Sequence, residues 1–153
     1  MTGQWQIPAA YLGSYGLSLK VCFLETILRD ERDGIVGQVE IAESELDDRC
    51  YAEIRVRDEL QLLDLTGDGP VRMGIPSDVA RSRRQALARK WSVAFHEHPQ
   101  KLDGIVYPSR LNGENNLAIY SRAVGKLGLL REQDLRHAPK LAEVLEDFFV
   151  ALL

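Results

Sequence analysis

Residues 103–120, DGIVYPSRLNGENNLAIY, constrain the fold more than any other part of this chain. A short apolar run at residues 104–107 is followed by an Asn112-Gly113 turn signal and by a second apolar run at residues 117–120. Two such runs around an Asn-Gly pair are typical of antiparallel strands joined by a polar loop. The sequence therefore predicts a strand, a loop and a return strand.

Ser109 stands where the first of these strands should end. Side chains at strand ends often project into clefts, which hold binding and catalytic groups. One interpretation makes Ser109 a turn residue, because serine is common where strands end. Another makes it a hydrogen-bond donor to a ligand. No GxSxG pattern surrounds Ser109, so a hydrolase triad is unsupported.

Composition excludes several classes of protein. The chain has 153 residues, enough for one domain with its own core. A net charge of -4 and an isoelectric point near 5.4 argue against a protein that mainly binds a nucleic-acid backbone. The N-terminus lacks the pattern of a signal peptide, and no apolar stretch has the length of a membrane span. We therefore expect a cytoplasmic protein without membrane contacts.

The cysteines and histidines do not predict a metal site. Cys22 and Cys50 have neither metal-ligand spacing nor a disulfide framework, and we expect two buried thiols in a reducing compartment. His96 and His98 form an H-x-H pair, but in a helix they point to different sides and no third ligand follows. A cluster at a helix end, where His is electrostatically favoured, is the preferred interpretation.

The remaining segments alternate between helical and extended patterns. A helix is expected over residues 18–30, with Ser18 as its N-cap and with Val21, Leu24 and Leu28 on its buried face. Strands are expected near residues 11–13, 37–42 and 52–57, an apolar run at 61–65, a helix over 77–98 and a C-terminal helix within 134–153. The buried faces of the last two helices should be Leu87, Trp91, Ala94 and Phe95, and Leu141, Val144, Leu145, Phe148 and Leu152. This mixture predicts an α+β fold, a compact mixed sheet flanked by helices.

Glu25 stands on the edge of the apolar face of the first helix. It can be an exposed acid paired with Arg29 at i+4. It can also be a partly desolvated acid that faces a cleft and orients a sugar hydroxyl or carries a proton. The basic run at residues 81–90 could hold a phosphate or nucleic acid. Its positions fall away from Leu87 and Trp91, which favours the solvated face of an amphipathic helix.

Taken together, these segments resemble the RES domain family, bacterial proteins named for recurring Arg, Glu and Ser residues. The resemblance covers residues 11–122 and rests on motifs in the family's order. These are a Tyr-Leu strand, CFLET on a helix, LLDLTG, a GIP turn, a helix with an internal Trp, and DGIVYPSR followed by NLAIYSR. The family Glu matches Glu25 and the family Ser matches Ser109. The aromatic residue of the strand before the Glu helix matches Tyr11, with Tyr15 as the alternative.

The resemblance implies one RES-like domain over residues 1–153, with a fold similar to ADP-ribosyltransferase domains. It implies cleavage of the bond between nicotinamide and ribose in NAD, by phosphorolysis or hydrolysis. NAD is then the substrate, and neither a prosthetic group nor a metal is needed. Some members are toxins neutralised by an Xre-type antitoxin. The implied partners are therefore NAD, inorganic phosphate and such an antitoxin. The chain would contact nucleic acid only indirectly, through the antitoxin. A homo-oligomer is compatible with this pattern.

Within that resemblance, Glu25 and Ser109 are the expected catalytic residues. Glu25 would hydrogen-bond the ribose hydroxyls and offset the positive charge of an oxocarbenium-like transition state. Ser109 would hold the nicotinamide ribose or amide in register. The expected NAD-binding residues are Tyr11, by stacking on a ring or through its hydroxyl, and Arg110. Arg110 could meet a phosphate or form a structural ion pair.

One departure from the family concerns its arginine. Family members have a further strand before the Glu helix, and an Arg on it grips the NAD phosphates or ribose. No arginine precedes Arg29 in this sequence, and Lys20 and Arg29 stand at other positions. A shortened domain, substitution by another basic group and impaired NAD cleavage are the three explanations. The alternative functions are a non-catalytic module that binds a nucleotide or an antitoxin-like partner, and an enzyme that transfers ADP-ribose to a protein.

Overall fold

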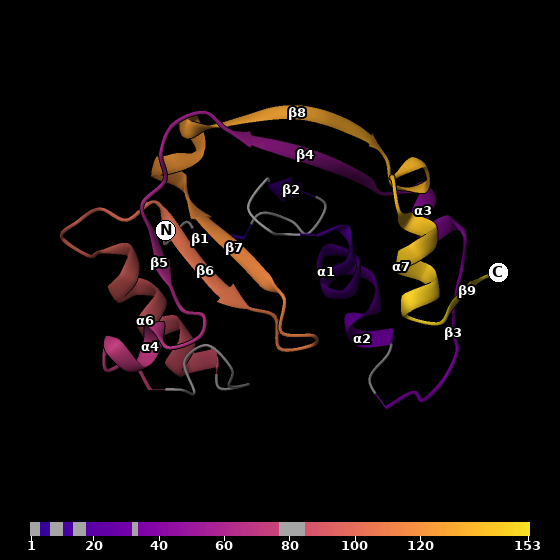
Figure 1. Ribbon diagram of the computed structural model, residues 1–153, viewed down its shortest axis with the longest axis horizontal. Helices are drawn as coiled ribbons and strands as arrows, with labels where there is room; N and C mark the ends of the chain where they lie inside the picture. Colours follow the sequence, from indigo (N-terminus) through magenta and orange to yellow (C-terminus); the bar gives the residue numbers. More distant parts are fainter. Residues whose placement is uncertain (1–3, 7–10, 14–17, 32–33, 77–84) are drawn as a thin grey trace. The chain divides into compact units, whose positions relative to one another are not determined.

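The computed structural model describes residues 4–6, 11–13, 18–31, 34–76 and 85–153 (Figure 1). Strands and helices mix without regular alternation, so the predicted α+β class is confirmed. The chain forms two compact units. The hairpin unit comprises Met1–Ile7 and Val56–Gly128, and the Glu25 unit comprises Pro8–Arg55 and Leu129–Leu153. The expected single domain stays a prediction, because two compact units can belong to one domain.

A four-stranded sheet of order β1-β7-β6-β5 forms the hairpin unit. Its strands are β1 (Gln4–Gln6), β5 (Leu62–Asp64), β6 (Gly104–Pro108) and β7 (Asn115–Tyr120). β6 and β7 are antiparallel, from Gly104 opposite Ile119 to Pro108 opposite Asn115, which confirms the predicted hairpin (Figure 1). The two strands approach closely at Gly104, where a Cβ atom would meet the carbonyl oxygen of Ala118. Glycine is therefore required at this position.

Helix α6 (Gln85–His96) buries aromatic residues against this sheet. Phe95 is buried and Trp91 is half-buried, with their ring centroids 5.5 Å apart. The prediction was wrong for Ala94, which is exposed. The buried stripe follows the i, i+4 pair Trp91 and Phe95, and Ala94 falls beside it. The expected start of the helix at residue 77 and the side chain of Leu87 lie outside the described residues.

A buried carboxylate joins the segments around the hairpin. Asp103, with 5% of its surface exposed, accepts hydrogen bonds from the Gln61 amide at 2.7 Å and from Lys126 Nζ at 2.8 Å. Its own amide donates to the Gln61 carbonyl, and its carbonyl accepts from the Tyr120 amide. Burial alone raises the pKa of Asp103, but the Lys126 and Gln61 hydrogen bonds and the positive charges of Lys126 and Arg122 together hold it below its ordinary value. Asp103 is therefore ionised and paired in the folded chain.

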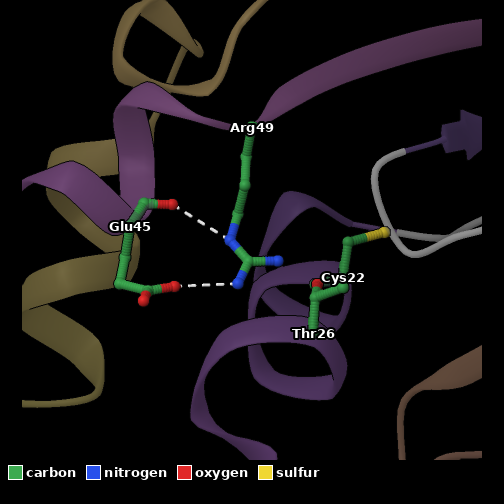
Figure 2. Close-up of polar contacts among 4 residues, drawn as sticks. All are labelled: Cys22, Thr26, Glu45 and Arg49. Carbon is green, nitrogen blue, oxygen red and sulfur yellow. Dashed lines mark hydrogen bonds and ion pairs between the residues drawn. The ribbon is translucent and has the colours of Figure 1, made fainter.

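We predict that Asp103→Asn lowers the free energy of unfolding by about 2 kcal/mol at pH 7, because it removes a charged hydrogen-bond acceptor from Lys126. The pKa of Asp103 is lower in the folded chain than the unfolded value of about 3.9, so its stabilisation is complete above that pH and is lost as the pH falls through the folded pKa. Urea unfolding at pH 7 and below pH 4 measures both effects. The control is Glu45→Gln, which breaks the exposed 2.8 Å ion pair with Arg49 shown in Figure 2 and should cost less than about 0.5 kcal/mol. Equal losses for the two variants would contradict the anchoring role of Asp103.

The Glu25 unit contains a broken helix and a second helix over short strands. The broken helix consists of α1 (Leu19–Phe23), a π-helical turn η1 (Leu24–Leu28) and α2 (Arg29–Glu31), which confirms the predicted helix at residues 18–30. The strands form a three-stranded sheet of order β2-β4-β8 and a β3-β9 pair. Their bounds are Tyr11–Gly13 (β2), Val39–Ile41 (β3), Cys50–Val56 (β4), Leu127–Asp134 (β8) and Val150–Leu152 (β9). Two of the three boundaries between the units fall within β4 and β8.

Short helical segments complete the two units. In the hairpin unit they are α4 (Gly69–Arg72) and the 3-10 turn η2 (Ser121–Lys126). In the Glu25 unit they are α3 (Ser44–Asp47), the 3-10 turn η3 (Leu135–His137) and α7 (Leu141–Asp147). The core of the Glu25 unit joins Phe23, Leu24, Ile27 and Leu28 of the broken helix to Leu141 and Val144 of α7. The buried faces predicted for these two helices therefore meet each other.

The predicted C-terminal helix forms near its expected start at Pro139 but ends earlier than expected. The exposed strand β8 ends at Asp134, and α7 begins at Leu141 and ends at Asp147. Phe149 has a φ of 53°, in the left-handed region that stops a helix, and its carbonyl accepts a hydrogen bond from the Val39 amide. β9 then pairs in parallel with β3, placing Leu152 opposite Ile41. Leu152 packs on the core as a strand residue rather than as a helical one.

The two thiols lie in different surroundings. Cys22 is buried as predicted, but the prediction was wrong for Cys50, which is exposed at the start of β4. The Cys50 thiol donates a hydrogen bond to Glu132 at 3.4 Å. This bond, partial burial and the negative charges of Glu132 and Asp134 raise the pKa of Cys50. The pattern of β4 alone could not show this, because β8, which carries Glu132, lies far away in sequence.

We predict that one thiol per folded chain reacts with Ellman's reagent at pH 8, and that the second reacts only in urea. Cys50→Ser should abolish the reaction of the folded chain, whereas Cys22→Ser should leave it unchanged. Glu132→Gln should speed the reaction, because a lower pKa gives more thiolate at the same pH. The assignment fails if Cys22 is the thiol that reacts in the folded protein.

Candidate functional site

The four expected site residues divide between the two units. Tyr11 and Glu25 belong to the Glu25 unit, and Ser109 and Arg110 belong to the hairpin unit. The structure brings the members of each pair together in one unit. The catalytic and binding roles of all four residues stay predictions.

Ser109 directly follows β6 and begins the loop of the hairpin. Only 4% of its surface is exposed, and its hydroxyl oxygen accepts a hydrogen bond from the Leu111 amide at 3.1 Å. Its amide donates to the Glu114 carbonyl at 2.6 Å, and its carbonyl accepts from the Gly113 amide at 3.0 Å. Ser109 is therefore a turn residue of the kind predicted, held by both its backbone and its side chain. This rigid setting is also suited to fixing a hydroxyl against a ligand.

The rest of the loop explains the Asn112-Gly113 signal. The side-chain oxygen of Asn112 accepts a hydrogen bond from the Glu114 amide at 3.0 Å. Gly113 has a φ of 78°, in the left-handed region that glycine adopts without strain. Arg110 lies in the same loop and is exposed, so its guanidinium is accessible to an anionic ligand. The loop thus holds Ser109 rigidly and leaves Arg110 at the surface.

Glu25 is half-buried at the second position of the π-helical turn. Ser18 caps the helix as predicted, since its hydroxyl accepts a hydrogen bond from the Val21 amide at 3.2 Å. The predicted buried residues Val21, Leu24 and Leu28 are all in the core. Apolar packing therefore holds the helix on the side next to Glu25. A carboxylate at such a border is partly desolvated and still accessible.

Tyr11 begins β2, which pairs in parallel with β4 and places Tyr11 opposite Ala52. α1, which leads into the Glu25 turn, contacts β2. The strand of the expected aromatic residue and the helix of the expected acid are therefore neighbours. The alternative, Tyr15, lies outside the described residues.

Two basic residues flank the π-helical turn: Lys20 before it and Arg29 directly after it. Lys20 already has partners. Its Nζ atom lies 2.7 Å from Asp147 and 5.2 Å from the ring centroid of Phe148. These contacts fasten α1 to the end of α7. The other residue, Arg29, is exposed at the start of α2. Of the two, Arg29 has the more accessible side chain for an anionic ligand.

His96 lies at the end of α6, and His98 follows it. His96 is the last residue of α6, and its ring lies edge-on to Tyr120 with centroids 5.0 Å apart. His98 Nδ1 accepts a hydrogen bond from the Gln100 amide. Among the described residues, no group of three His, Cys, Asp or Glu side chains is placed to bind a metal.

In the basic run at 81–90, Lys90 is exposed, and the other basic side chains lie outside the described ones.

Tyr120 is a buried polar residue that the sequence pattern did not reveal. It is fully buried, and its hydroxyl has no hydrogen-bond partner within the described part of the chain. Burial raises its pKa, while the charge of Arg122, whose guanidinium lies 5.3 Å from the ring centroid, opposes this shift. Arg122 also donates to the His96 carbonyl at 2.5 Å. Tyr120 therefore acts as a packing residue of the core.

An open depression of about 470 Å³ lies where β5 leads into α4. Its lining includes Asp64, Asp68 and Arg72, and the Asp64 carboxylate accepts hydrogen bonds from the amide and the hydroxyl of Thr66. This is the LTGDG turn of the sequence. None of the four expected site residues lines it.

No described helix has the length and apolar character that crossing a membrane requires.

Two similarities to known proteins bear on these residues. The RES domain family model matches residues 3–140, a range that contains all four expected site residues. The probable toxin y4kH of Sinorhizobium fredii is 37% identical over 127 residues, which are 82% of this chain and the whole of that protein. No solved structure matches the chain.

Proposed function

This chain belongs to the RES domain family, and from that membership we propose that it is a toxin that cleaves the nicotinamide-ribose bond of NAD. The observation that carries the proposal is the family match over residues 3–140, a range that contains both Glu25 and Ser109. The alignment with the whole of a probable toxin supports the toxin role.

Glu25 is the proposed catalytic carboxylate. Cleavage of the nicotinamide bond builds positive charge on the ribose ring, and a carboxylate beside the ring lowers the energy of that state. A half-buried acid is suited to this task, because partial exclusion of water strengthens its interaction with the developing charge. Nicotinamide leaves as a neutral molecule, so the reaction needs no strong general acid.

Ser109, Arg110 and Tyr11 are proposed to bind the substrate. The Ser109 hydroxyl is held by the Leu111 amide and would fix the nicotinamide ribose or amide in register. The exposed guanidinium of Arg110 would meet a phosphate. Tyr11 would stack on a ring or donate its hydroxyl.

The two units differ in net charge. The hairpin unit has 11 Lys and Arg against 8 Asp and Glu, a net charge of +3, whereas the Glu25 unit has 8 against 15, a net charge of -7. The two sum to the net charge of -4 for the chain. The positive charge of the hairpin unit, which carries Arg110, supports the proposal that this unit attracts the pyrophosphate of NAD.

The acceptor in the proposed reaction is inorganic phosphate or water. Water gives ADP-ribose, nicotinamide and a proton; phosphate gives the 1-phosphate of ADP-ribose and nicotinamide. An Xre-type antitoxin is the proposed partner that neutralises the toxin in the cytoplasm. The second candidate function is a catalytically impaired module that binds a nucleotide or such a partner, which the unmatched family arginine favours. An ADP-ribosyltransferase that modifies a protein is the third.

We predict that the purified protein releases nicotinamide from NAD and that Glu25→Gln lowers the rate about 100-fold or more, as loss of a charge-stabilising group does in other enzymes. Chromatography of nicotinamide, with and without added phosphate, measures the rate and identifies the acceptor. Glu31→Gln is the control, because Glu31 is an exposed acid on the same broken helix. NAD left intact after long incubation at high protein concentration would contradict the proposed enzymatic function. NAD binding by calorimetry without turnover would support the second candidate.

A second prediction separates binding by Ser109 from its role in the loop. Ser109→Ala and Asn112→Ala each remove one side-chain hydrogen bond to a loop amide, and each should cost about 1 kcal/mol of stability. Only Ser109→Ala should also lower kcat/KM for NAD, because only Ser109 is proposed to touch the substrate. The two free energies come from urea unfolding and the kinetics from nicotinamide release. Equal kinetic losses in both variants would make Ser109 a loop residue alone.

A further inference from the structure

The helix that carries Glu25 changes its hydrogen-bond register one residue before Glu25, at Leu24. α1 ends at Phe23, the π-helical turn η1 runs over Leu24–Leu28, and α2 resumes at Arg29. A π-helical turn pairs residues five apart instead of four, and such turns occur often at functional sites. Glu25 lies within this turn.

The altered turn bears on the surroundings of Glu25. In a regular α-helix, Glu25 would share a face with Val21, four residues earlier, and with Leu28, three residues later. Both of these residues are fully buried, with 0% of their surface exposed, whereas Glu25 is half-buried. A wider turn changes the angular offset between these positions. It thereby allows the two apolar side chains to stay in the core while the carboxylate lies at its border.

Thr26 makes a polar contact to the preceding turn. Its hydroxyl donates a hydrogen bond to the carbonyl of Cys22, four residues earlier. Figure 2 labels both residues on the helix. In a regular α-helix that carbonyl is the partner of the Thr26 amide. A threonine hydroxyl that bonds to the i-4 carbonyl competes with the regular ladder and often bends the helix. Cys22 is buried and Thr26 is exposed, so this bond links the outer side of the π-helical turn to the packed side of α1.

We propose that Thr26 is a positioning residue, whose hydroxyl holds the π-helical register and thereby sets the direction of the Glu25 carboxylate. This inference rests on the proposed function, in which Glu25 stabilises the ribose cation. Thr26 acts through Glu25 and does not touch the substrate. A displacement of a catalytic group by about 1 Å can lower a rate as much as 100-fold, so a register bond next to Glu25 has a measurable effect on turnover.

The test compares Thr26→Val with Thr26→Ser. Valine keeps the branched shape of threonine and removes the hydroxyl, and serine keeps the hydroxyl and removes the methyl group. Thr26→Val should lower kcat about tenfold with KM for NAD nearly unchanged, because only the transition state uses the direction of Glu25. Thr26→Ser should restore kcat. Since Thr26 is exposed, both variants should fold, and urea unfolding checks this.

A double-variant cycle tests whether Thr26 acts through Glu25. If it does, Thr26→Val should have no further effect on the residual rate in a Glu25→Gln background. Wild-type kcat in Thr26→Val, failure of Thr26→Ser to restore the rate, or additive losses in the double variant would each overturn the positioning role while leaving the proposed function intact. A wild-type protein that leaves NAD unchanged would overturn the proposed function itself, and with it this inference.

Discussion

The buried charge of Asp103 is the interaction on which the hairpin unit depends. An ionised carboxylate removed from water must be paired and hydrogen-bonded, and Asp103 meets this requirement through Lys126 and the Gln61 amide. The same residue bonds the Tyr120 amide through its carbonyl. It thus joins the chain before β5, the start of β6, the end of β7 and η2. Because the register of β6 and β7 begins next to Asp103, this anchor also fixes the far end of the hairpin, where Ser109 lies.

In the Glu25 unit, the acid Glu25 has surroundings that differ from those of Asp103. Glu25 lies at the edge of a core formed by the broken helix and α7, and the change to a π-helical register coincides with its position. The helix is fastened at its start by Ser18, the Lys20–Asp147 ion pair ties it to α7, and apolar packing holds Leu28 at its end. These contacts hold the helix from several sides. Asp103 is thus buried and paired with Lys126, whereas Glu25 is half-buried at the edge of a core.

Features encoded by neighbouring residues could be predicted from the sequence. The hairpin follows from two apolar runs around Asn112-Gly113, and the Ser18 cap follows from its place before an apolar stripe. β9, the exposure of Cys50 and the role of Asp103 depend on partners far away in sequence. β9 pairs with β3 more than 100 residues earlier; Asp103 and Lys126 are 23 residues apart. The π-helical turn was missed for another reason, since apolar periodicity does not distinguish i+4 from i+5 pairing over a single turn.

The unmatched family arginine concerns binding of the substrate more than breaking of its bond. An arginine that grips the phosphates or ribose of NAD through contacts equal in the ground and transition states lowers KM without raising kcat. In the proposed function, the positive charge of the hairpin unit, including the exposed Arg110, would be a second source of attraction for the phosphates. Glu25, which is present in this chain, is proposed to stabilise the charge that develops on the ribose. Of the three explanations, substitution by another basic group is the one that leaves the proposed chemistry unchanged. It would be recognised by a high KM for NAD together with an ordinary kcat.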